Sequence, residues 1–201
     1  MRKFLLATAL ALIAVPAFAA TTNWTIDPAA SKLTWTVPFN KQPVSGQFDK
    51  WTGIIVFDPD NLPASSLTII VDLASVDSKD PNRDGTIKGP DFFNVAATPT
   101  ATFTSTKITK TSQGYVAGGN LSLGGVSKPL AVPFSLTING TKALGNGTIT
   151  ISRNAFGIGK GQWQSASEVG DLVNVSFTVA ANAAAAPAVA VNPTAKDVND
   201  R

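Results

Sequence analysis

Leu130-Ala131-Val132-Pro133-Phe134-Ser135-Leu136-Thr137-Ile138 alternates a large apolar residue with a small or hydroxyl-bearing one along its whole length. Successive side chains of a β-strand point to opposite faces of the sheet, so this period predicts a strand with one apolar and one solvated face. The same alternation predicts further strands at Leu33–Val37, Leu67–Leu73, Ala101–Phe103, Ile149–Ile151 and Val173–Val179, and two more strands are predicted at Gly53–Phe57 and Tyr115–Leu123.

Short turn signals separate these segments and suit an antiparallel sheet. Asp58-Pro59, Asn139-Gly140 and Asn146-Gly147 are each predicted to connect two strands. No amphipathic helical stretch of ordinary length competes with the strands. The sequence therefore predicts an all-β fold, an antiparallel barrel or sandwich of about eight strands.

Residues 78–94 interrupt the alternation and contain the charged and aromatic residues of greatest interest. The charged pair Arg83-Asp84 is followed by Gly89-Pro90 and by the apolar pair Phe92-Phe93. Asp80-Pro81 predicts a short helix that begins at Pro81 or Asn82. We expect this segment to cover one end of the barrel as a lid or rim.

Both ends of the chain differ from the domain between them. Residues 1–19 contain a basic start, an apolar run and the small-residue pattern Ala17-Phe18-Ala19, which together predict a cleaved signal peptide. Residues 20–182 form the predicted domain. Residues 183–201 are rich in Ala and Pro without an apolar face, and predict a flexible tail. No later segment is long and apolar enough to predict a transmembrane helix in the mature chain.

Composition excludes many kinds of chemistry. Loss of Arg2 and Lys3 with the signal leaves 14 basic and 13 acidic side chains, a net charge of +1, so the charge does not favour nucleic acid as a partner. The chain has no Cys and no His. These absences exclude thiol nucleophiles, Ser-His-Asp triads and zinc or haem held by such ligands. We predict no catalytic residue, no metal site and no cofactor.

An ordered series of residues carries a family resemblance. It comprises Trp24-x-Ile26-Asp27, Ser31-x-Leu33-x-Trp35-x-Val37, Gly46-x-Phe48, Gly53-x-Ile55-x-Phe57-Asp58-Pro59, Arg83-Asp84, Asp91-Phe92-Phe93, Pro99-x-Ala101-x-Phe103-x-Ser105, Gly119-x-Leu121-x-Leu123-x-Gly125-Val126-x-Lys128 and Arg153-x-x-Phe156-Gly157-Ile158. In order and spacing, from about residue 22 to residue 180, the chain resembles the YceI family of periplasmic lipid-binding proteins. The resemblance implies an extended lipocalin-like barrel with an apolar channel for polyisoprenoids, such as isoprenoid quinones or polyprenyl phosphates. It also implies a periplasmic location, with an extracellular one left open.

The chain departs from this family where many relatives have histidine. Ala30, Phe39-Asn40 and Thr86 occupy those positions here. Any polar task that imidazoles perform in relatives therefore has no imidazole to perform it here, whereas an apolar channel does not need them.

Two roles are open for the apolar residues. Inward-facing side chains can contact a bound chain or fill a solid core, because both demand apolar positions. Phe92 and Phe93 can likewise line the mouth of a channel or plug the end of the barrel. On the resemblance, the predicted ligand contacts are Trp35, Phe48, Ile87, Phe92, Phe93, Phe103, Phe134, Leu136, Phe156 and Ile158.

Two arginines are candidates for the polar head group of a ligand. The planar guanidinium of Arg83 or Arg153 suits a phosphate or quinone oxygen. The alternative is a structural role, which for Arg83 is an ion pair with Asp80, Asp84 or Asp91.

The sequence thus favours an exported, non-enzymatic carrier of an isoprenoid lipid or quinone. A homodimer is left open. A second hypothesis is an interaction module of the cell envelope with a filled barrel. A third is a hydrolase using a pair among Asp49, Asp58, Asp72 and Glu168, which is the weakest because any chain offers such pairs.

Overall fold

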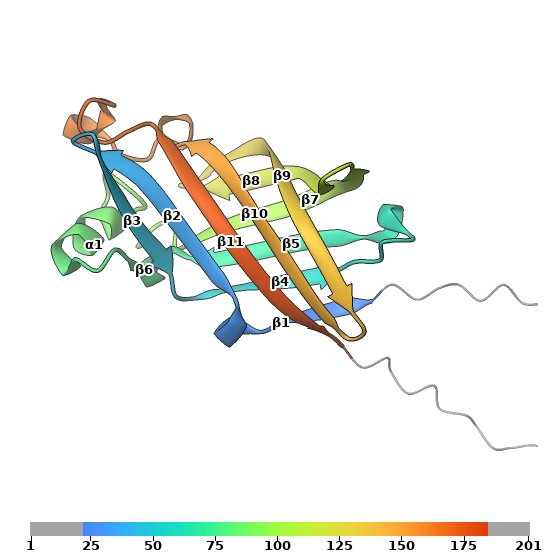
Figure 1. The fold of residues 1–201 in the computed structure, drawn as a ribbon. Coiled ribbons are helices and arrows are strands. Elements are labelled where there is room, and N and C mark those ends of the chain that lie inside the picture. The colour runs from blue at the N-terminus through green and yellow to red at the C-terminus, as the bar shows by residue number, and fades with distance from the viewer. Residues whose placement is uncertain (1–21, 185–201) are drawn as a thin grey trace, which may run out of the picture.

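Eleven strands form one continuous antiparallel sheet in the computed structural model, which describes residues 22–184 (Figure 1). The strands are β1 (Asn23–Ile26), β2 (Lys32–Phe39), β3 (Gln42–Phe48), β4 (Trp51–Val56), β5 (Ser66–Asp72), β6 (Val76–Asp77), β7 (Thr100–Thr111), β8 (Gly114–Leu123), β9 (Val126–Asn139), β10 (Lys142–Ser152) and β11 (Leu172–Ala183). The predicted signal peptide lies outside the described residues, as does the predicted tail except for its first two residues. The first of these, Ala183, is the last residue of β11.

The sheet closes into a barrel because β1 pairs with strands on both sides. The order β1-β4-β5-β7-β8-β9-β10-β11 returns to β1, whose Trp24 lies opposite Ala183 of β11. Farther along the same edge of β11, residues 174–178 pair with β2. From β2 the sheet continues through β3 to β6, which ends the order at a free edge. The predicted all-β antiparallel barrel of about eight strands is confirmed.

One α-helix, α1 (Pro81–Lys88), interrupts the strands where the sequence predicted it. The Asp80 carboxylate caps its first turn by accepting hydrogen bonds from the backbone N–H groups of Asn82 and Arg83, at 3.0 and 3.1 Å. The helix lies at the end of the barrel that carries β6 and the β2–β3 hairpin (Figure 1). Short 3₁₀ helices span Pro28–Ala30, Leu62–Ala64, Leu73–Ser75, Asn154–Phe156 and Gly161–Gln164.

The turn predicted at Asn146-Gly147 is wrong, because β10 runs through both residues. Gly147 is needed for close packing of neighbouring atoms and not for a turn of the chain. A Cβ atom at this position would lie 2.3 Å from Cζ of Phe177 and 2.5 Å from the carbonyl oxygen of Pro133. The glycine therefore lets β9 and an inward-facing ring from β11 approach the backbone of β10. The predicted turn at Asn139-Gly140 does connect β9 and β10.

Aromatic side chains fill the end of the barrel away from α1, which we call the aromatic end. Phe57 meets Tyr115 edge to face, with ring centroids 5.1 Å apart, and Tyr115 stacks on Phe134 at 5.5 Å. Trp24 lies in the same cluster and donates a hydrogen bond from Nε1 to the carbonyl oxygen of Phe57, at 3.1 Å. This end is thus sealed by side chains of the barrel's own strands.

Residues 81–99 and 153–170 cover the other end, which we call the lid end. Its core cluster contains Leu73, Leu123, Phe156 and Ile158, with Phe92 and Phe93 packed against it. The predicted position of the helical segment over one end of the barrel is confirmed (Figure 1).

Candidate ligand cavity

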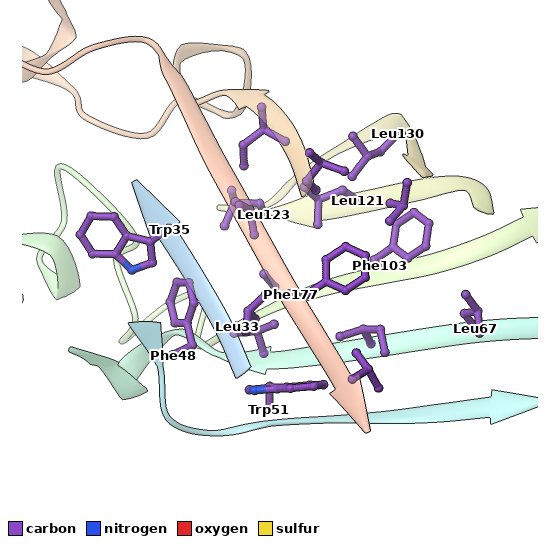
Figure 2. A pocket seen from close by; sticks show the side chains of 18 of the residues that line it. Leu33, Trp35, Phe48, Trp51, Leu67, Phe103, Leu121, Leu123, Leu130 and Phe177 are labelled. Atoms are coloured by element: carbon purple, nitrogen blue, oxygen red, sulfur yellow. The ribbon is translucent and has the colours of Figure 1, made fainter. Parts of the chain in front are cut away.

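A cavity of about 320 Å³ occupies the barrel interior between the aromatic end and the lid. Nearly every long strand contributes inward-facing side chains to it, and the surface that it presents is apolar. Figure 2 shows Leu, Trp and Phe side chains from opposite walls turned toward the same space. Protein interiors rarely leave voids larger than a water molecule, so a space of this size calls for a functional explanation.

The residues predicted to contact a ligand line this cavity, with the exception of Phe156. Phe156 is buried beside Leu123 and Ile158 in the core of the lid end, where it packs the barrel rim. Whether the lining residues contact a ligand stays a prediction. For Trp35, Phe48, Phe103, Phe134 and Leu136 this position in the lining follows from the alternation of their strands, whereas Ile87 comes from α1 and Phe92, Phe93 and Ile158 come from the loops at the lid end.

The lining also includes residues that the sequence analysis did not single out. Trp51 is the clearest case, because it shares the parity of Gly53 and Ile55 on β4 and faces inward with them. Extending the alternation of that strand by one step would have found it. The other additions come from strands whose inward face was predicted, and include Leu33, Leu67, Ile69, Val71, Leu121, Leu130, Val132, Ile149, Val173, Val175 and Phe177.

The lid, residues 81–99, contacts both strand β3 and the neighbouring loop of residues 153–170. Phe93 packs against Phe48 of β3, with ring centroids 6.0 Å apart, and Phe92 packs against Trp163 at 5.7 Å. The carbonyl oxygen of Asp91 accepts hydrogen bonds from the N–H groups of Gly159 and Lys160, both at 2.8 Å. Phe92 and Phe93 therefore both line the cavity and cover its end, which combines the two roles left open by the sequence.

Arg153 is buried at the lid end with all of its N–H groups engaged. Nε donates to the carbonyl oxygen of Gly170 at 3.0 Å, and Nη2 donates to that of Val169 at 2.7 Å and to that of Ser165 at 3.3 Å. Nη1 donates to the carbonyl oxygen of Ile158 at 2.8 Å and to the side chain of Asn154 at 3.2 Å. These bonds leave no free donor for a head group, so the contacts support the structural role.

Burial of this guanidinium affects its acidity. Desolvation lowers the pKa of Arg153 from its ordinary value, and the nearby Asp171 carboxylate acts in the opposite direction. The carbonyl oxygens around the guanidinium compensate for the lost water. Because they belong to residues 158–159 and 165–170, the hydrogen bonds of Arg153 connect these two segments of the loop.

Arg83 lies on α1 outside the cavity lining. Its Nη2 pairs with Oδ2 of Asp80 at 3.2 Å, and both side chains remain partly exposed. This ion pair is one of the structural alternatives considered for Arg83. The Asp84 carboxylate instead accepts a hydrogen bond from the backbone N–H of Ser78, at 2.9 Å.

The polar chemistry of the described residues is sparse. Between residues 22 and 184, no cluster of three or more His, Cys, Asp or Glu side chains is placed to hold a metal ion. No helix in that range is long and apolar enough to span a membrane. Two buried side-chain polar atoms in it have no hydrogen-bond partner, Nε1 of Trp35 and Oγ of Ser78.

Comparison with known proteins decides the family. The sequence matches the YceI-like domain over residues 24–181. The chain belongs to the YceI family. The resemblance inferred from the sequence motifs is thus confirmed.

Relatives and solved structures agree with this assignment. A UPF0312 protein of Yersinia enterocolitica is 37% identical over 100 residues, which cover 50% of this chain and 52% of that protein. The chain therefore spans about half the length of the curated relatives it matches. The crystal structure of BcnA from Burkholderia cenocepacia has a TM-score of 0.73 and 30% identity, and covers 77% of this chain and 98% of that one.

Two further structures share the YceI barrel. A YceI protein of Campylobacter jejuni has a TM-score of 0.63 and 26% identity, over 69% of this chain and 84% of that one. A polyisoprenoid binding domain from Saccharophagus degradans has the same TM-score at 16% identity, over 80% of this chain and 98% of that one. The likeness to the Saccharophagus domain shows the fold alone.

Proposed function

We propose that this YceI protein is an exported, non-enzymatic carrier that holds a long-chain isoprenoid lipid inside the barrel. The ligand is of the quinone or polyprenyl phosphate type, and the protein acts in the periplasm. One observation carries the proposal: the barrel interior contains an apolar cavity of about 320 Å³, bounded by the aromatic end and the lid.

The cavity suits a ligand that is mostly hydrocarbon. Small-molecule sites occupy roughly 300–1,000 Å³, and the space found here lies within that range. Burial of apolar surface contributes about 25 cal/mol for each Å² removed from water. A long isoprenoid chain thus needs few polar contacts to bind, which agrees with the apolar lining.

The comparisons with known proteins also support an isoprenoid ligand. The fold is shared with a domain from Saccharophagus degradans that is described as polyisoprenoid binding. A non-enzymatic role is supported by the lack of His and Cys in the sequence. The filled-barrel alternative requires the inward-facing side chains to meet across the interior, and a cavity of this volume weighs against it.

Lipid extraction tests the proposal directly. We expect organic extracts of gently purified protein to contain a stoichiometric isoprenoid by mass spectrometry, and delipidated protein to take up added ubiquinone. Quenching of tryptophan fluorescence measures that uptake, since Trp35 and Trp51 line the cavity. Repeated extracts without lipid, together with no uptake of quinone, would overturn the carrier proposal.

A pair of neighbouring substitutions separates cavity binding from adsorption to the surface. Val175 lines the cavity and is the cross-strand partner of Trp35 on the adjacent strand β2. Asn174, the preceding residue of β11, is exposed. Val175→Trp fills the cavity and is expected to reduce quinone uptake at least tenfold, whereas Asn174→Trp leaves it unchanged. Equal uptake by the two variants would place the lipid outside the barrel.

A further inference from the structure

The indole N–H of Trp35 is an unpaired donor within the wall of the apolar cavity. Trp35 is 8% exposed as a residue and lines the cavity, yet Nε1 has no hydrogen-bond partner. More than about nine in ten buried polar groups in proteins are paired, so an exception of this kind points to a partner that comes from outside the protein. The indole nitrogen can only donate, so that partner must be an acceptor.

A glycine fixes the position of this ring. Trp35 on β2 lies opposite Gly46 on β3. A Cβ atom on Gly46 would lie 2.3 Å from Cζ2 of Trp35 and 2.6 Å from Cε2, so the indole lies directly over the backbone of Gly46. Any larger residue at position 46 would displace the ring. The unpaired donor is therefore held in place by the sheet beneath it.

The other buried indole shows how the fold treats the same group elsewhere. At the aromatic end, Nε1 of Trp24 donates to the carbonyl oxygen of Phe57. Toward the lid end, the corresponding atom of Trp35 has no such partner. In Figure 2 its nitrogen lies on the edge of the ring turned toward Phe48.

We propose that Trp35 Nε1 recognises the head group by donating a hydrogen bond to a neutral oxygen, such as a quinone carbonyl, on an otherwise hydrocarbon ligand. This inference rests on the carrier function proposed above. Water is a poor occupant, because a buried water needs two to four polar partners and the surrounding surface is apolar. An oxygen attached to a hydrocarbon needs only the one donor.

The same site discriminates against an anionic head group. Arg153 is the charged residue in the cavity lining, and all of its N–H groups bond to protein oxygens. Burying a phosphate without a cation or several donors is costly. A polyprenyl phosphate would therefore place only its chain in the cavity, which makes the quinone class the better match for Trp35.

Access to the donor is linked to the lid. Nε1 is covered by its neighbours, so a ligand oxygen reaches it when an adjacent side chain turns away. Phe48 is the diagonal neighbour of Trp35 on β3, and it packs against Phe93 of the lid at 6.0 Å. Rotation of Phe48 would thus expose the donor and loosen the lid together.

Two conservative variants and two ligands test the assignment. Trp35→Phe removes the N–H and keeps an aromatic ring, and Trp51→Phe makes the same change at another cavity-lining tryptophan. The ligands are ubiquinone and the hydrocarbon squalene, titrated into delipidated protein. We expect Trp35→Phe to weaken ubiquinone binding about tenfold relative to squalene, whereas Trp51→Phe leaves that ratio unchanged.

Because squalene is a hydrocarbon and accepts no hydrogen bond, its affinity reports any loss of binding that comes from the smaller ring volume alone. If Trp35→Phe preserves the ratio of ubiquinone to squalene affinity, the head-group assignment is overturned while the carrier function stands. If wild-type protein binds neither ligand, the carrier proposal and this inference fall together.

Nuclear magnetic resonance provides a readout that does not depend on the stability of a variant. The chain has four tryptophans, whose indole ¹H–¹⁵N signals can be assigned with single Trp→Phe variants. Ubiquinone is expected to move the Trp35 indole proton downfield, and squalene is not. Equal shifts with both ligands would contradict a hydrogen bond to the quinone.

Discussion

The aromatic end of the barrel is closed by its own strands, whereas the lid end is closed by residues 81–99 and 153–170. At the aromatic end β1 pairs with β4 and β11, so the backbone ladder is continuous and the rings of Phe57 and Tyr115 fill the space inside it. At the lid end the sheet stops at the free edge of β6. Aromatic contacts and loop hydrogen bonds complete the closure there.

This difference separates stability from access. Opening the aromatic end requires breaking strand pairs, which couples it to global unfolding. Opening the lid breaks no strand pair and requires the loss of the aromatic contacts of Phe92 and Phe93 and of the loop hydrogen bonds to the carbonyl oxygen of Asp91. We therefore expect a ligand to enter and leave past the lid, with the aromatic end as the fixed base of the cavity.

The largest effect is expected from a truncation at the aromatic end. Phe57 is 3% exposed and packs against Trp24, Tyr115 and Phe134, so Phe57→Ala should lower the free energy of unfolding by about 3–5 kcal/mol. Chemical denaturation measures this change. A loss no greater than that caused by Phe92→Ala at the lid would remove the distinction between the two ends.

A substitution at Arg153 tests whether the closure of the lid end depends on one buried side chain. Arg153→Lys keeps the charge but offers three donors where the guanidinium makes bonds to oxygens of several loop residues. We expect a loss of about 2–4 kcal/mol in stability, because buried carbonyl oxygens lose their partners. Hydrogen exchange should rise first in residues 158–170. Uniform exchange over the whole barrel would show instead that Arg153 supports the global fold.

Phe92 tests access at the lid. Because Phe92 is only half-buried, Phe92→Ala should cost about 1–2 kcal/mol in stability, yet it removes the contact with Trp163 that holds the lid to the loop. Release of bound ubiquinone is expected to become several-fold faster, as measured by stopped-flow fluorescence. An unchanged release rate, with Phe57→Ala accelerating release instead, would place the exit at the aromatic end.

Many of the strands and the position of the helix could be predicted from local patterns in the sequence. The period of two assigned the inward faces of β2, β9 and β11, and Asp80-Pro81 located the start of α1. Such signals are local, because parity and capping depend on neighbouring residues. The turn predicted at Asn146-Gly147 failed because the need for glycine there comes from Phe177, a residue distant in the sequence.

The open interior and the role of Arg153 could not be predicted for related reasons. Trp35 and Leu136 would be apolar in a packed core as well as in a cavity, so their identity does not reveal the space between them. Apart from the side-chain oxygen of Asn154, the oxygens that bind Arg153 are backbone carbonyls of residues 158–170, and a carbonyl has no sequence signature. The ion pair of Arg83 with Asp80, by contrast, lies within one helical turn and was among the alternatives.

The smallest effect concerns the helix cap of the lid at low pH. Hydrogen bonds from the backbone N–H of Arg83, and also from that of Asn82, hold the pKa of the Asp80 carboxyl below its ordinary value of 3.8. A depressed folded-state pKa means that the ionised carboxylate stabilises the folded lid. Its contribution is fully present above the unfolded pKa and is lost as the pH falls through the lower folded one.

Amide exchange of α1 should therefore accelerate in acid, below about pH 3.8, before exchange at the aromatic end does. Asp80→Asn retains a capping oxygen but does not titrate, so it should remove much of this pH dependence. The pKa of Asp77 is also lowered, because of its hydrogen bonds with Lys79. Asp77→Asn is therefore the matched control, and it should leave the response of α1 in place. If the control abolishes the response and Asp80→Asn does not, the lid is governed by the end of β6 rather than by the cap of α1.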